Sequence, residues 1–221
     1  MKLLLNSFFL SLFFVCFPVF GEDYQKDFTV KVSGIKIGKL SWSVSISDEG
    51  YYNDLRLKSE GLLSAIYQFE GKYFSEGVFQ NKKLKPIRYK HIWITNKVTK
   101  NMELVFQDNK IKSLIQTPFE KEKLRINVFN IEQSKDPLTS FLQIILGEKS
   151  SLVIDGRRTY IMSSVFNKKT KQNIVEISEY SNLWADHKRK EFEKLIFEKK
   201  DGDLFPTKIH IHFDGRVFKL E

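Results

Sequence analysis

The chain has 221 residues, a single cysteine, and 36 lysines and arginines against 27 aspartates and glutamates, which give a net charge of +9. This length allows a sizeable core, and one cysteine excludes a small scaffold held by disulfides. The basic charge would suit nucleic acid, but its runs at 82–85, 168–171 and 187–190 are scattered, so we expect no nucleic-acid partner.

The first 21 residues predict a cleaved secretory signal peptide. One lysine is followed by a long apolar run, and Val19 and Gly21 suit the −3 and −1 positions of a signal-peptidase site. An uncleaved membrane anchor is the alternative, although the run is at the short limit for a span. Cys16 follows large residues, which argues against a lipoprotein. With residues 1–21 removed, we expect a periplasmic protein of net charge +8 that forms a single mostly-β domain over residues 22–221.

Short segments of alternating polar and apolar residues then recur, separated by turn residues. The cleanest is 39–47, where apolar side chains alternate with four serines, as in a half-buried strand. Residues 124–128 repeat this pattern more briefly. Asp-Asn and Asp-Gly suit the positive-φ positions of tight hairpin turns, so successive hairpins predict an antiparallel β protein. The predicted hairpin turns are Asp108-Asn109, Asp155-Gly156 and Asp214-Gly215.

Residues 136–146 predict the main helix. Asp136 can act as N-cap, Pro137 suits the first helical position, and Gly147 can end the helix after apolar residues at helical spacing. We expect this helix to cover the apolar face of a curved antiparallel sheet or half-barrel. Whether the sheet closes into a barrel is left open by the pattern.

Two further segments are ambiguous. Residues 60–69 could hold a kink or a short turn. Residues 187–198 could be helical by their charge pattern, but the Asp201-Gly202 turn and the extended run after Pro206 favour a strand.

An ordered set of segments spans nearly the whole chain after the leader. These are 34–38, 57–79, 84–89, 136–146, 153–162 and 199–221. Together they resemble an uncharacterised periplasmic family, domain of unknown function 3108. The resemblance implies a periplasmic, mostly-β protein and no catalytic residues. The expected fold is also similar in style to the half-barrels of lipoprotein carriers, in which a curved antiparallel sheet wraps helices.

The sequence IHIHF raises the question of a metal site. His210 and His212 are two residues apart, so both would point the same way on a strand. A catalytic zinc ion typically takes three protein ligands, and only His91 and His187 remain in the chain. We therefore expect no metal and no cofactor. A metal-dependent enzyme that uses His210 and His212 stays a minor alternative.

Other catalytic signals are also absent from the sequence. It contains no GxSxG elbow and no glycine-rich phosphate loop, and it has no cysteine after the predicted leader. We therefore expect a protein that is not an enzyme.

Aromatic residues give the remaining functional hint. In 88–95, Tyr89 and Trp93 share one face of a predicted strand whose other face is also apolar. Ordinary core packing is one interpretation. The other is an apolar pocket between sheet and helix, with Trp42, Tyr67, Tyr89 and Trp93 as the predicted ligand-binding residues.

The sequence thus favours an exported, non-catalytic envelope protein that binds a hydrophobic small molecule or lipid. The alternative is a structural or interaction module that docks on a partner protein or on an anionic envelope surface, including peripheral association with the membrane. The ligand's identity, the oligomeric state and any protein partner are not encoded in a recognisable motif.

Overall fold

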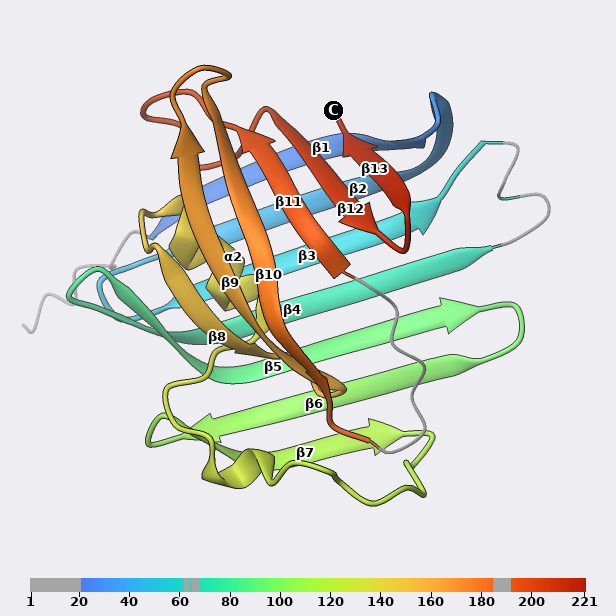
Figure 1. The fold of residues 1–221 in the computed structure, drawn as a ribbon, viewed down its shortest axis with the longest axis vertical. Coiled ribbons are helices and arrows are strands. Elements are labelled where there is room, and N and C mark those ends of the chain that lie inside the picture. The colour runs from blue at the N-terminus through green and yellow to red at the C-terminus, as the bar shows by residue number, and fades with distance from the viewer. Residues whose placement is uncertain (1–20, 62–63, 65–67, 185–191) are drawn as a thin grey trace, which may run out of the picture.

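A computed structural model describes residues 21–61, 64, 68–184 and 192–221, in which the chain forms one sheet of 13 strands (Figure 1). The strand order is β7-β6-β5-β4-β3-β2-β1-β13-β12-β11-β10-β9-β8, and every neighbouring pair is antiparallel. Strands β7 and β8 end this order without pairing with each other, so the sheet is open. The predicted class, a mostly-β curved antiparallel sheet with one main helix, is confirmed.

The sheet has two halves that follow each other along the chain. The N-terminal half consists of β1 (Glu22–Val32), β2 (Ile35–Ile46), β3 (Tyr51–Ser59), β4 (Phe69–Gln80), β5 (Lys83–Thr95), β6 (Thr99–Gln107) and β7 (Lys110–Thr117). The C-terminal half consists of β8 (Ser150–Ile154), β9 (Arg158–Asn167), β10 (Gln172–Asn182), β11 (Phe192–Glu198), β12 (Lys208–Phe213) and β13 (Arg216–Leu220). Between them lie the short helix η1 (Val128–Asn130) and the helix α2 (Pro137–Ile145).

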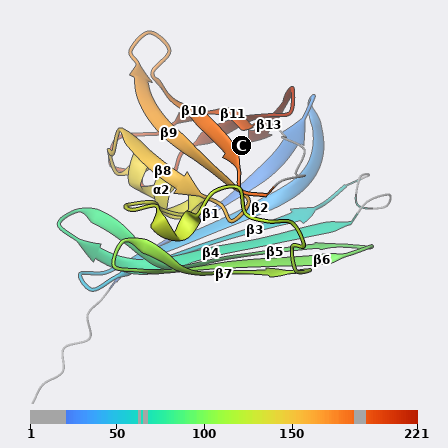
Figure 2. The same cartoon turned by 60° about the horizontal axis from the view of Figure 1, so that its bottom comes forward.

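The two halves face each other across α2 (Figure 2). The main core draws on all three parts: Phe28 and Trp42 come from the N-terminal half, Leu142 from α2, and Val175 and Phe197 from the C-terminal half. The helix therefore fills the space that the two apolar faces would otherwise expose. None of the helices in the described residues is long and apolar enough to cross a membrane.

Local sequence signals account for several strand boundaries. Asp108 and Asn109 have φ values of 52° and 61°, and Asp214 has 53°, as hairpin turns of this kind require. The alternating segment 39–47 lies mostly in β2, where every second residue from Leu40 to Val44 is buried. The predicted hairpins at Asp108-Asn109 and at Asp214-Gly215 are confirmed.

One predicted strand is wrong. Residues 124–128 do not join the sheet: Leu124 makes an isolated bridge to Trp184, and η1 begins at Val128. The Asn127 side chain accepts the backbone N–H of Phe129 and so caps this turn, which competes with an extended conformation. The alternation reflects packing on a small core cluster rather than strand pairing.

The ambiguous segments are settled in part. Residues 192–198 form β11, so the strand favoured there is confirmed, whereas 187–191 lie outside the described residues. Most of the interior of 60–69, including Tyr67, also lies outside them, as do residues 1–20 of the predicted signal peptide.

The N-terminus of α2 is fixed by a buried carboxylate. Asp136 is 0% exposed, and its Oδ1 accepts the backbone N–H groups of Leu138 and Thr139, both at 3.0 Å. Its Oδ2 accepts the hydroxyls of Thr139 and of Ser75 on β4, the latter at 2.9 Å. The Tyr51 hydroxyl on β3 lies 2.6 Å from the Thr139 hydroxyl. Burial raises the pKa of Asp136, while these hydrogen bonds act to lower it. The predicted N-cap is thus also the anchor of α2 on the sheet.

We expect Asp136→Ala to lower the free energy of unfolding by about 3 kcal/mol, because the helix loses its cap and buried hydroxyls lose their acceptor. Urea unfolding at neutral pH measures this. Asp201→Ala, at an exposed turn position, is the matched control and should change stability by less than about 0.5 kcal/mol. Equal effects of the two substitutions would contradict the anchoring role.

Candidate functional site

A cavity of about 410 Å³ lies between α2 and the two halves of the sheet. Its wall is built from β3, β4 and β5 on one side, from β9 to β12 on the other, and from the first turns of α2. The described residues that line it are apolar or aromatic except His91, Asp155, Arg157 and Arg158. Its size and composition fit the range of small-molecule sites.

The wall from the N-terminal half is aromatic and uncharged at neutral pH. Tyr73 on β4 and Tyr89 on β5 flank His91, with ring-centroid distances of 5.4 Å and 6.4 Å. Burial raises the pKa of Tyr73 to about 12. Burial, together with the positive charge of Arg157, lowers the pKa of His91 to about 4. Tyr89 and His91 share a face because they are two residues apart on one strand.

The helix contributes the floor through Phe141. Its ring stacks on Trp42 at 5.7 Å and meets the edge of Phe197 at 5.6 Å. Trp42 is 1% exposed and donates its indole N–H to Asn53 Oδ1 at 2.7 Å. The Asn53 amide in turn donates to the carbonyl of Leu138 on α2. The floor is therefore held by both packing and hydrogen bonds.

The wall from the C-terminal half is also aromatic. Tyr160 on β9 stacks on Tyr180 of β10 at 6.0 Å, and Phe192 meets Tyr160 edge-on at the same distance. Burial raises the pKa of Tyr160 well above its usual value, so this ring too is uncharged. The Arg158 guanidinium lies over the Tyr180 ring, 5.6 Å from its centroid.

The charged groups of the cavity are gathered at the turn between β8 and β9. Asp155 Oδ1 accepts the backbone N–H groups of Arg157 at 2.8 Å and of Arg158 at 2.7 Å. Burial raises the pKa of Asp155, and the two arginines oppose this shift. Gly156 has a φ of +85°, and its carbonyl accepts the Gln116 side-chain amide at 3.1 Å. The turn is thus fixed to β7 and presents both arginines to the cavity.

The predicted ligand-binding residues that the structure describes do not all line the cavity. Tyr89 lines the cavity. Trp42 lies behind Phe141 in the core, and Trp93 stacks on Phe69 at 5.3 Å without lining the cavity. Tyr67 lies outside the described residues.

The two arginines were not anticipated from the sequence. The residues DGRR at 155–158 could have indicated them, because a tight turn between two buried strands brings consecutive basic residues to the end of a sheet.

The histidine pair lies on β12, as the alternation predicts. His210 and His212 are both partly buried and alternate with Ile209 and Ile211, of which Ile211 lines the cavity. Burial and the nearby Lys194 lower the pKa of His212. Within the described ranges, no three His, Cys, Asp or Glu side chains are grouped as metal ligands. The absence of a metal and of a cofactor stays a prediction.

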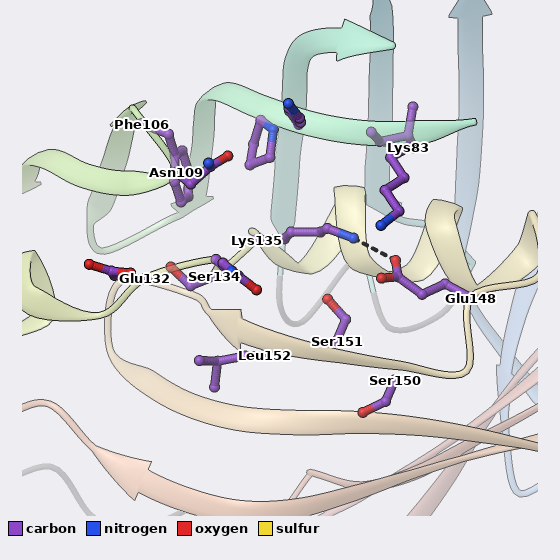
Figure 3. Close-up of a pocket in the computed structure, with 14 residues that line it drawn as sticks. Lys83, Phe106, Asn109, Glu132, Ser134, Lys135, Glu148, Ser150, Ser151 and Leu152 are labelled. Atoms are coloured by element: carbon purple, nitrogen blue, oxygen red, sulfur yellow. Dashed lines mark hydrogen bonds and ion pairs between the residues drawn. The ribbon is translucent and has the colours of Figure 1, made fainter. Parts of the chain in front are cut away.

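A second hollow of about 470 Å³ lies between the start of β5, the segment before α2 and β8 (Figure 3). Its acidic groups are paired: Lys135 binds Glu148, as Figure 3 shows, and Lys110 binds Glu132 at 2.8 Å. Serine hydroxyls and lysines form much of the remaining lining. This hollow is therefore less suited to an apolar ligand than the aromatic cavity.

Comparison with known proteins gives a family and a fold. The model of a family described as "Protein of unknown function (DUF3108)" matches residues 27–179. A crystal structure from Brucella abortus, described as a beta-barrel-like protein of domain of unknown function DUF1849, is similar with a TM-score of 0.50. The two chains share 10% identity, and the similarity covers 92% of this chain and 95% of that one, which supports the fold alone. No curated protein matches this chain.

We expect stability to fall as the pH drops from 6.5 to 4, in part because of His91. The unfolded chain binds a proton at this histidine below about pH 6.5, whereas the folded chain does so only near pH 4. The contribution is absent above pH 7 and reaches about 3 kcal/mol of destabilisation below pH 4. Urea unfolding of wild type and His91→Phe across this range measures it. Parallel pH profiles for the two proteins would contradict the assignment.

Proposed function

This chain belongs to the family described as protein of unknown function (DUF3108), and we propose that it is an exported, non-catalytic binding protein of the cell envelope. Its ligand is a hydrophobic or lipid-like molecule in the aromatic cavity between α2 and the two halves of the sheet. The cavity itself carries this proposal, because an apolar space of about 410 Å³ bounded by neutral aromatic rings favours transfer of an apolar chain from water. The apolar leader at residues 1–21 supports export.

The ionisable groups of the cavity support binding rather than catalysis. A histidine with a pKa near 4 is a weak base at neutral pH, and His91 makes no hydrogen bond to a hydroxyl among the described residues. Asp155 Oδ1 already accepts two backbone N–H groups. Among the described residues, neither side chain makes a hydrogen bond to a hydroxyl that it could activate.

We expect the protein, purified from a periplasmic extract of cells that express the full sequence, to bind the uncharged dye N-phenyl-1-naphthylamine saturably. The substitution Ile211→Trp fills part of the cavity and should weaken dye binding about tenfold or more, since the added ring occupies the dye's volume. Ile115→Trp, at a position 54% exposed on β7, is the matched control and should keep wild-type affinity.

Fluorescence titration gives the affinities, and intact mass shows whether the chain begins at Glu22. Absence of saturable binding, or equal loss in both variants, would overturn the binding role of the cavity.

A second candidate function, docking on an anionic membrane surface, is favoured by the tip of the β9–β10 hairpin. This hairpin projects at the top of Figure 1. Val165 and Phe166 near its tip are 63% and 54% exposed. The turn that follows carries Lys168, Lys169 and Lys171. None of these three lysines has an ion-pair partner in the described part of the chain. Exposed apolar side chains beside unpaired lysines complement the interface of an anionic bilayer.

Hydrogen bonds hold the turn between β9 and β10 in a defined conformation. Asn167 Oδ1 accepts the backbone N–H groups of Lys169 at 3.0 Å and Thr170 at 3.3 Å. The backbone N–H of Ser164 donates to the carbonyl of Lys149, which brings a fourth exposed lysine to the base of the tip. The hairpin thus presents its apolar pair and its cations on a fixed support.

We expect the protein to sediment with phosphatidylglycerol vesicles and to be released by 0.5 M salt, because the attraction is between exposed charges. Phe166→Ser should weaken this association about tenfold. Phe119→Ser removes a ring that is 83% exposed elsewhere and should have no effect. Equal binding to phosphatidylcholine vesicles, or an unchanged affinity for Phe166→Ser, would exclude this docking mode.

A further inference from the structure

We propose that the ligand of the aromatic cavity carries an anionic head, a carboxylate or a phosphate, which Arg157 and Arg158 bind while its apolar chain lies between the aromatic walls. This inference rests on the proposed binding function and specifies its ligand class.

The backbone of the two arginines is held in place by the turn and by its neighbours. Both line the cavity at the start of β9, and their backbone N–H groups are held by Asp155 Oδ1. A side chain in place of the Gly156 hydrogen would come within 2.4 Å of Met102 Sδ, so the turn sits tightly against β6. The carbonyl of Arg157 accepts the backbone N–H of Leu183 at 2.8 Å. A fixed backbone lowers the conformational freedom that these two residues lose on binding an anion.

The guanidinium groups retain unused hydrogen-bonding capacity. The Nε atoms of Arg157 and Arg158 are both buried, and neither has a hydrogen-bond partner among the residues that the structure describes. Buried donors in native proteins are nearly always paired, so two unpaired donors on side chains that line the cavity leave these guanidinium groups able to take up an acceptor. A carboxylate or phosphate matches the planar fork of a guanidinium.

The positive charge of the two arginines is only partly compensated by the described acidic residues of the cavity. Among the described residues, Asp155 is the only acidic residue that lines the cavity, and it lies 3.8 Å from the Arg158 guanidinium. Arg157 forms no ion pair in the described part of the chain. Two cations against one carboxylate leave an excess positive charge beside apolar walls, which an anionic group would compensate.

In the described part of the chain, the remaining walls offer the rest of the ligand no charge. Tyr160 and Tyr180 stack beside the arginines, and the rings of Tyr73 and Tyr89 lie on the opposite side with His91. His91 is uncharged at neutral pH, since burial and Arg157 hold its pKa near 4. One cationic corner in an otherwise neutral aromatic space selects an amphiphile, rather than a purely apolar or a cationic molecule.

The test displaces bound N-phenyl-1-naphthylamine from the protein with four ligands of one chain length: dodecanoate, dodecyl phosphate, dodecanol and dodecylammonium. We expect at least one of the two anions to displace the dye at a concentration about tenfold or more below that of dodecanol, because charge-assisted hydrogen bonds are strong in apolar surroundings. Dodecylammonium should be the weakest. Comparison of dodecanoate with dodecyl phosphate shows whether the head is a carboxylate or a phosphate.

The arginines are tested by a ratio within each variant: the dodecanol concentration that displaces the dye, divided by that of whichever anion displaces it best from the wild-type protein. Arg157→Gln should lower this ratio, and Arg157→Gln/Arg158→Gln should bring it to about 1. Arg56→Gln removes the same charge from a side chain that is 61% exposed on β3, and should keep the wild-type ratio. The wild-type ratio tests the proposal independently of whether the variants fold.

Dye binding with equal displacement by dodecanol and both anions would overturn this inference and leave the proposed function standing. Retention of the wild-type ratio by both Arg157→Gln and the double variant would likewise overturn the inference alone. Absence of saturable dye binding by the wild-type protein would overturn both proposals.

Discussion

The buried carboxylate of Asp136 fixes the position of α2 on the sheet. Because α2 lines the cavity, this position also determines the shape of the cavity. Four hydrogen bonds converge on this buried group, two from the backbone of α2 and two from hydroxyls of Thr139 and Ser75. An N-cap on the surface would only begin a helix. Here the cap also fastens the helix to β4, and through Thr139 to Tyr51 on β3. The first turn of α2, which lines the cavity, cannot shift without breaking buried polar contacts.

By packing against the open sheet, the helix α2 protects it, as pairing of the first and last strands protects a closed barrel. Its Gln143 side chain accepts the backbone N–H of Leu84 and donates to the carbonyl of Lys82, which ties α2 to the start of β5. On the other side, Ser140 bonds Ser151 of β8. Both ends of the sheet are partly covered by the crossing segment, through bridges at Lys110–Glu132 and Lys135–Val153. The halves can therefore stay apart around a cavity without leaving two long bare edges.

Basic side chains lie in two different environments in the structure. Lysines surround the exposed apolar pair at the β9–β10 tip, where solvent screens them. Arginines occupy the β8–β9 turn at the opposite end of β9, within an aromatic enclosure where an unpaired charge matters more. Lysine suits a hydrated bilayer interface, and arginine suits a buried anion with defined geometry. Strand β9 thus carries a proposed surface contact at one end and a proposed ligand contact at the other.

The sequence by itself determined the features that depend on neighbours along the chain. Period-two alternation gave β2, Asp-Asn and Asp-Gly turns gave the hairpins, and Asp136 with Pro137 marked the start of α2, since strand and cap chemistry act over a few residues. It also placed Tyr89 on an aromatic strand face. Only the tertiary structure decided that this face meets a cavity while Trp42 lies behind Phe141, and that 124–128 packs without pairing. It alone brought Arg157 and Arg158 to the cavity that His91 also lines. These contacts join residues far apart in the chain, and their geometry follows from how α2 separates the two halves, which no local pattern encodes.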